Sequence, residues 1–118
     1  MNFAGKTVLV LEDDGLLAME LDVVLQDYGA VVVGPMYTVA ESLAALAGGP
    51  VDAAVLDVNL GAESSEPVAD RLADAGTPFL YLSGHDAGRL PERHRDRPLV
   101  PKPFVERDLL ARLNALFD

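Results

Sequence analysis

The sequence lacks several features that would assign the protein to other classes. It contains no cysteine, which excludes disulfide bonds and thiolate chemistry. Nine Lys and Arg residues stand against nineteen Asp and Glu, and the formal net charge of −10 argues against non-specific binding to DNA. The first residues lack a signal-peptide pattern, and no apolar run is long enough to span a membrane. We therefore expect a cytoplasmic protein that binds neither nucleic acid nor membranes.

Half of the 118 residues are apolar, and a chain of this length can bury the core of one domain. Short apolar runs alternate along it with segments whose apolar residues recur at helical spacing. The predicted strands are 7–11, 31–33, 53–56, 77–82 and 99–100, and the predicted helices are 16–28, 38–47, 65–75 and a last one from about residue 105. Segment 85–97 breaks this pattern and predicts a short or irregular fourth helix. The alternation predicts an α/β fold, with a parallel sheet covered by helices on both faces.

Local signals indicate where several elements begin and end. Asp13 or Asp14 is suited to cap the first helix, and Thr38 to cap the second. Gly34 and Pro35 are expected to close the second strand. The apolar face of the first helix is expected to comprise Leu17, Leu21, Val24, Leu25 and Tyr28.

Acidic side chains follow two of the predicted strands. Glu12, Asp13 and Asp14 come directly after the first strand, and Asp57 comes at the end of the third. In a doubly wound sheet of order 2-1-3-4-5 these strands are neighbours at the topological switch point, where ligands bind. Carboxylates that converge there resist simultaneous ionisation, and a divalent cation with hard oxygen ligands, such as Mg²⁺, relieves the conflict.

Two further polar side chains are expected at the same edge of the sheet. Ser83 follows the fourth strand, and Lys102 follows the fifth. A hydroxyl and an ammonium group opposite a metal-bound carboxylate form a pocket for a phosphoryl group, with Asp57 as the nucleophile. Each residue alone has a simpler interpretation, as a helix start, a turn residue or a solvated loop lysine. It is improbable that these simpler interpretations apply independently at four strand ends on the same edge of the sheet. A phosphoryl-binding site is therefore favoured.

The sequence resembles a response-regulator receiver (CheY-like) domain over nearly its whole length. The motifs that carry the resemblance are VLVLEDD at 8–14, LDVNL at 56–60, LSG at 82–84 and PKPF at 101–104. The resemblance implies a flavodoxin-like, doubly wound, five-stranded parallel sheet of order 2-1-3-4-5. It also implies one receiver domain over residues 1–118, which we expect to lack an output domain.

The resemblance implies a role for each residue of the site. Asp57 would accept a phosphoryl group from a phosphohistidine, Ser83 would bind a phosphoryl oxygen, and Lys102 would pair with the acyl phosphate. The implied ligands of Mg²⁺ are Glu12, Asp13, Asp57 and the main-chain carbonyl of Asn59. The bond between Lys102 and Pro103 is cis in the family. The protein would then be a single-domain regulator of a two-component system or phosphorelay, catalysing only its own phosphotransfer and dephosphorylation.

A finer resemblance concerns PFLYLSGH at 78–85 and LPER at 90–93. These segments are similar to the FAT GUY subgroup, mostly single-domain receivers with a shortened or mobile fourth helix. Leu99 stands where ordinary receivers carry an aromatic residue that rotates as the signal switch. We therefore hypothesise that the response to phosphorylation lies in segment 85–97, for which a solvated basic loop is the simpler interpretation.

The expected partners are a sensor histidine kinase or histidine phosphotransfer protein and a downstream protein target. Leu16, Met19 and Val23 form a second apolar set on the first helix, which either docks a partner or, for Val23 above all, completes the core. In the family, partners also use the loop that contains Pro103 and Phe104. A homodimer through the last helix or the surface beside the fifth strand is left open. His85 and His94 are solitary in the sequence, which argues against a phosphodonor role.

Two other functions are weighed against this interpretation. Asp57-Val58-Asn59 also resembles the Asp-x-Asp motif of hydrolases that form an aspartyl phosphate from small phosphate esters. Those enzymes carry the motif on an early strand and have a substrate cap, for which this chain has no room. A nucleotide-binding function has even less support, because neither the Gly-x-Gly-x-x-Gly motif nor the Gly-x₄-Gly-Lys motif occurs in the sequence. A receiver that only binds a partner ranks low, since all four types of site residue are present.

Overall fold

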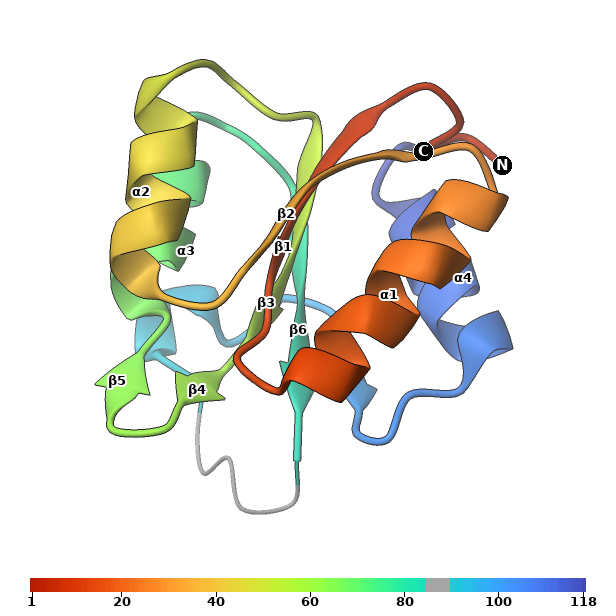
Figure 1. Cartoon of the computed structure of the whole chain (residues 1–118). Helices are drawn as coiled ribbons and strands as arrows, with labels where there is room; N and C mark the ends of the chain where they lie inside the picture. Colours follow the sequence, from red (N-terminus) through yellow and green to blue (C-terminus); the bar gives the residue numbers. More distant parts are fainter. Residues whose placement is uncertain (85–89) are drawn as a thin grey trace.

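The computed structural model describes residues 1–84 and 90–118 (Figure 1). Its central element is a parallel sheet of strands β1 (Thr7–Leu11), β2 (Val31–Met36), β3 (Ala53–Asp57), β6 (Phe79–Ser83) and β7 (Leu99–Pro101), in the order β2-β1-β3-β6-β7. This confirms the predicted order, in which β1 and β3 are neighbours. The carboxyl ends of the strands meet at one edge of the sheet, called the carboxyl edge below.

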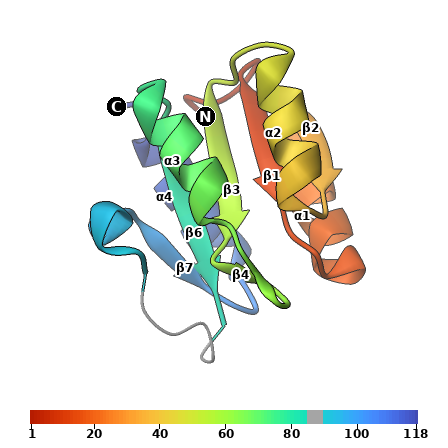
Figure 2. The ribbon, with the colours of Figure 1, turned by 90° about the vertical axis from the view of Figure 1, so that its left-hand side faces the viewer.

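In residues 1–84 and 90–118, four α-helices are found, and they cover the two faces of the sheet (Figures 1 and 2). They are α1 (Gly15–Asp27), α2 (Val39–Ala47), α3 (Glu66–Asp74) and α4 (Glu106–Ala115). Helices α1 and α4 pack on one face, and α2 and α3 pack on the other. Every residue of β3 is buried, which explains why this strand is an uninterrupted apolar run until its final aspartate.

Two of the helices begin at the predicted caps. The carboxylate of Asp14 accepts hydrogen bonds from the N–H groups of Leu16 and Leu17, at 3.0 and 3.2 Å. Thr38 forms a capping box with Glu41 at the start of α2. Of the two candidate caps, Asp14 therefore fixes the start of α1 at the carboxyl edge.

Two predictions about local structure were wrong. Strand β2 continues through Gly34 and Pro35 to Met36, because it is an edge strand and its pairing with β1 is irregular between Leu9 and Leu11, where a missing N–H is tolerated. Helix α1 buries Ala18, Leu21 and Leu25, and Tyr28 is 42% exposed. Leu17 and Val24 are half-buried, so the predicted face was wrong at Tyr28 and missed Ala18.

Three short elements complete the described structure. Strands β4 (Asn59–Leu60) and β5 (Glu63–Ser64) form a small antiparallel hairpin directly after β3. The pattern of long runs did not predict it, because each strand has only two residues. The 3-10 turn η1 (Glu92–His94) is the described part of the predicted short or irregular fourth helix. Residues 85–89, including His85 and part of the segment hypothesised to respond to phosphorylation, lie outside the described residues.

The first and last residues of the chain lie together, away from the carboxyl edge (Figure 1). The backbone N–H and the side-chain amide of Asn2 donate to the side-chain and main-chain oxygens of Asn114, and the amide also donates to Asp118 at 3.0 Å. Phe3 is fully buried beside this contact. Among the described helices, none combines the length and apolar character needed to cross a membrane.

Candidate functional site

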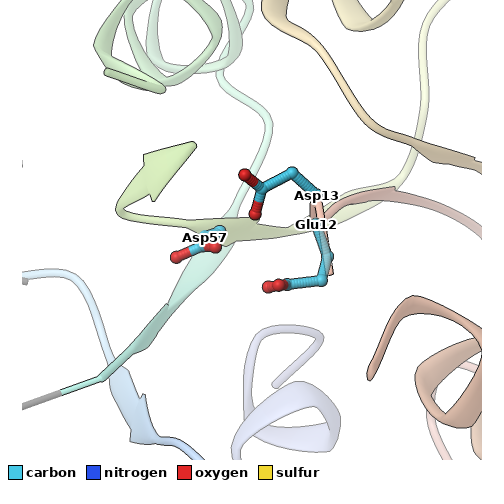
Figure 3. Close-up of side chains that lie close together, drawn as sticks. All are labelled: Glu12, Asp13 and Asp57. Atoms are coloured by element: carbon cyan, nitrogen blue, oxygen red, sulfur yellow. The ribbon is translucent and has the colours of Figure 1, made fainter. Parts of the chain in front are cut away.

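Three carboxylates converge at the carboxyl edge. Leu11 at the end of β1 pairs with Leu56 on β3, so the residues that follow, Glu12 and Asp57, emerge side by side. Glu12, Asp13 and Asp57 each place a carboxylate oxygen within 4.8 Å of the others (Figure 3). Glu12 is completely buried and Asp57 nearly so, whereas Asp13 is exposed. These three residues are called the acidic cluster below.

Lys102 completes the cluster from the end of β7. Its Nζ lies 2.7 Å from Oδ2 of Asp57, and 3.1 and 2.9 Å from Oε1 and Oε2 of Glu12. The backbone N–H of Lys102 donates to the carbonyl of Ser83 at 2.8 Å, which ties the end of β7 to the end of β6. The Lys102–Pro103 bond is cis, as the resemblance implied.

Burial and charge shift the titration of this cluster. Burial raises the pKa of Glu12 to about 7; the hydrogen bond from Lys102 opposes this shift, and the charge of Asp57 adds to it. Burial would lower the pKa of Lys102, but its hydrogen bonds to Asp57 and Glu12 outweigh that effect and the net shift is upward. One ammonium group therefore serves two buried acids, and the cluster carries surplus negative charge.

The surplus charge and the donor atoms fit a hard divalent cation. All three members of the acidic cluster offer carboxylate oxygens, and Asp13 lies on the solvent side, where a partly hydrated Mg²⁺ could enter. Asn59, the residue implied to supply a main-chain ligand, begins β4 two residues after Asp57 and pairs with Ser64.

Ser83 lies beside the cluster, but its hydroxyl points elsewhere. It is the last residue of β6, next to Leu82, which pairs with Asp57 across the sheet. The hydroxyl donates to the carbonyl of Gly84 at 3.0 Å. The structure therefore brings together Glu12, Asp13, Asp57 and Lys102, and places Ser83 at their margin.

Apolar side chains of α1 flank the site. Leu16 and Met19 are 64% and 57% exposed, and Val23 is 53% exposed, so the interpretation that Val23 completes the core was wrong. A cavity of about 300 Å³ lies between the start of α1 and Lys102–Pro103. A second, of about 380 Å³, is lined by Met19, Glu20, Val23, Val24, Phe104 and Glu106. Both cavities are lined by Glu20, so they are neighbours along α1; together they are called the groove below.

A second charged cluster, not predicted from the sequence, joins η1 to α3. Nε2 of His94 lies 2.7 Å from Oδ1 of Asp70, and the imidazole is fully buried against the ring of Phe79. Arg93 pairs with Asp70 at 3.2 Å and with Asp74 at 2.5 Å. His94, described as solitary in the sequence, therefore has a partner. Asp70, Asp74, Arg93 and His94 are called the α3 cluster below.

Comparison with known proteins gives several full-length structural matches. The solution structure of SdrG from Sphingomonas melonis Fr1 has 39% sequence identity and a TM-score of 0.86, covering 100% of this chain and 99% of SdrG. The BeF3-activated conformation of SdrG from Pseudomonas melonis Fr1 has 41% identity and a TM-score of 0.79, with 98% of each chain covered. A response regulator receiver protein from Sinorhizobium medicae WSM419 has 25% identity and a TM-score of 0.77, covering 95% of this chain and 94% of that one. No family model matches the chain, and no curated protein does.

Proposed function

The chain belongs to the family of response-regulator receiver domains, and from this premise we propose that Asp57 is its phosphoacceptor and that Mg²⁺ binds at the acidic cluster. A receiver is a signalling domain of two-component systems and not a classical enzyme. The observation that carries the proposal is the contact of Lys102 with both Asp57 and Glu12 inside the acidic cluster. The absence of an output domain and a cytoplasmic location stay predictions.

The contacts of Asp57 support a direct displacement. Lys102 engages Oδ2 of Asp57 at 2.7 Å, so we propose that Oδ1 attacks phosphorus. The new bond joins Asp57 to phosphorus, the nitrogen–phosphorus bond of the donor phosphohistidine breaks, and the imidazole leaves with its electron pair and takes a proton from solvent. Lys102 then neutralises a phosphoryl oxygen, and the hydroxyl of Ser83 turns from the Gly84 carbonyl to donate to another. A bound Mg²⁺ would neutralise the remaining phosphoryl charge.

Phosphorylation by a small donor tests this proposal. Wild-type protein mixed with Mg²⁺ and acetyl phosphate should gain the mass of one phosphoryl group, and Asp57→Asn should gain none, because the amide is a poor nucleophile. Intact-mass spectrometry measures both, and circular dichroism verifies that the variant is folded. A phosphoryl group found on the Asp57→Asn variant would contradict the assignment.

Family membership implies a histidine kinase as the phosphodonor, either directly or through a phosphotransfer protein. We propose that the donor docks on Leu16, Met19, Pro103 and Phe104, because these side chains line the groove that leads from the acidic cluster along α1. The acyl phosphate would then change binding of a downstream protein target.

Negative charge introduced into the groove distinguishes an effect on docking of the phosphodonor protein from an effect on the phosphorylation reaction itself. A Leu16→Glu, Met19→Glu double variant should slow phosphotransfer from a phosphohistidine protein but leave phosphorylation by acetyl phosphate unchanged. Val31→Glu is a matched control, because Val31 is also an exposed aliphatic residue, at the start of β2 away from the carboxyl edge. An equal rate of protein-to-protein transfer in the double variant and this control would reject the docking surface.

The hydrolase alternative is not favoured. Asp57 ends the third strand along the chain, and the full-length similarity is to receivers. Turnover of small phosphate monoesters would be the observation in its favour.

A further inference from the structure

The backbone that follows Asp57 is held from two sides at Val58. The N–H of Val58 donates to the carbonyl of Leu82 on β6 at 3.1 Å. The carbonyl of Val58 accepts two hydrogen bonds from Ser65, from the N–H at 3.3 Å and from Oγ at 3.0 Å. Val58 is 4% exposed and Ser65 is fully buried. The peptide units on both sides of Val58 are therefore fixed.

Ser65 does not use its hydroxyl in the way that its position predicts. It is the N-cap residue of α3, where a serine side chain normally accepts a hydrogen bond from the first turn of the helix. Asp14 and Thr38 do this for α1 and α2, but Ser65 makes no such bond. Its neighbour Ser64 accepts from the N–H of Glu66 instead, at 3.1 Å. The Ser65 hydroxyl is thus committed to the loop that follows Asp57.

The hydrogen bonds from Ser65 to the Val58 carbonyl close the base of the small hairpin of β4 and β5. Asn59 pairs with Ser64 and Leu60 with Glu63, around a turn in which Gly61 has φ of +66°. The Ser65–Val58 contact is the next rung of this ladder and joins it to the core. Because the carbonyl of Val58 and the N–H of Asn59 belong to one peptide unit, holding that carbonyl sets the direction in which the chain enters Asn59.

We infer that Ser65 is a positioning residue, whose buried hydroxyl holds the backbone between Asp57 and Asn59 in the arrangement that binds Mg²⁺. This inference rests on the proposed function, in which Asp57 and the main chain of Asn59 take part in binding the metal. Substituting a residue that orients metal ligands typically lowers metal affinity about 10- to 100-fold. In the metal-free protein, loss of the Ser65 hydroxyl should therefore make residues 59–64 more mobile.

A matched pair of serine variants tests the inference. Ser42 is also fully buried, and its hydroxyl also donates to a main-chain carbonyl, that of Thr38 at 3.1 Å, but it lies in α2. Ser65→Ala and Ser42→Ala therefore remove the same group at the same burial. Mg²⁺ is titrated into each protein while amide chemical shifts are recorded by NMR, and amide hydrogen exchange is measured without metal.

The expected result is a Mg²⁺ dissociation constant raised about tenfold in Ser65→Ala and unchanged in Ser42→Ala. Exchange at residues 59–64 should be faster in Ser65→Ala only. Ser65→Cys, which nearly preserves the volume but donates weakly, should weaken Mg²⁺ binding in the same direction if the alanine variant does not fold. Equal Mg²⁺ affinity in the Ser65 and Ser42 variants would overturn the positioning role alone. A wild-type protein that binds no Mg²⁺ would overturn both this role and the proposed function.

Discussion

The acidic cluster and the α3 cluster combine the same kinds of group in different proportions. At the carboxyl edge, the ammonium of Lys102 contacts two of three converging carboxylates, those of Glu12 and Asp57. On α3, two carboxylates face a guanidinium and an imidazole. The two carboxylates that contact Lys102 are buried, whereas the carboxylates of the α3 cluster are 40% and 67% exposed.

This difference separates a site for chemistry from a structural contact. Burying surplus negative charge is unfavourable for folding, and it is retained where a cation or a phosphoryl group will be handled. The contacts of the α3 cluster, with their largely exposed carboxylates, hold η1 against α3. Substitutions in the α3 cluster should therefore affect stability alone, whereas substitutions in the acidic cluster should also affect phosphorylation.

The largest expected change in stability comes from the buried member of the α3 cluster. His94→Ala should lower the free energy of unfolding by about 3 kcal/mol, because it empties a fully buried position beside Phe79. Urea unfolding measures this. Phosphorylation of the folded variant by acetyl phosphate should proceed at the wild-type rate, and a strongly reduced rate would break the distinction between the clusters.

A smaller loss of stability is expected when the acidic cluster loses Lys102. Lys102→Met should cost about 2 kcal/mol in metal-free protein at neutral pH, less than for a fully enclosed pair because Glu12 can take up a proton. Unlike His94→Ala, this variant should also be phosphorylated slowly. Urea unfolding in EDTA and the acetyl phosphate reaction measure the two effects; wild-type phosphorylation kinetics would argue against the role of Lys102.

The third effect is a pH dependence of stability that originates in the acidic cluster. Glu12 titrates near its ordinary value of 4.5 in the unfolded chain and near 7 in the folded protein, so the folded state binds more protons between these values. Stability in EDTA should therefore fall by about 1 kcal/mol as the pH rises from about 5 to about 6, as the linkage relation requires. Glu12→Gln should remove this slope, and an identical slope in the variant would assign it to another group.

The smallest effect is expected from the exposed base of the α3 cluster. Arg93 is 52% exposed, and its partners Asp70 and Asp74 are 40% and 67% exposed. Arg93→Ala should therefore lower the free energy of unfolding less than either substitution above, and salt should reduce the loss further. Urea unfolding at low and high salt measures it. A loss as large as that of His94→Ala would show that the pairs act as one buried network.

The sequence predicted the sheet well because its central strands are buried on both faces. Residues 7–11 and 53–56 are continuous apolar runs, and the acids that end them locate the carboxyl edge. The convergence of Glu12, Asp57 and Lys102 followed from strand order, which came from the resemblance. Helix starts at Asp14 and Thr38 were also predictable, since capping depends on neighbouring residues alone.

What the sequence did not predict depends on contacts between distant residues. Pro35 remains in β2 because of its register against β1, which no local signal reports. His94 and Asp70 are 24 residues apart, on a turn and a helix, so their pairing has no periodic signature. The hydroxyl of Ser65 looked like an ordinary helix cap, and only its contact with Val58 reveals its direction.

The bridge from Asn2 to Asn114 and Asp118 allows the order of the elements to be rearranged by circular permutation. A short peptide could connect Asp118 to Met1 at the edge of the sheet opposite the acidic cluster. New ends opened at Gly49, in the loop between α2 and β3, would make Asp57 part of the first strand synthesised while leaving its spatial neighbours in place.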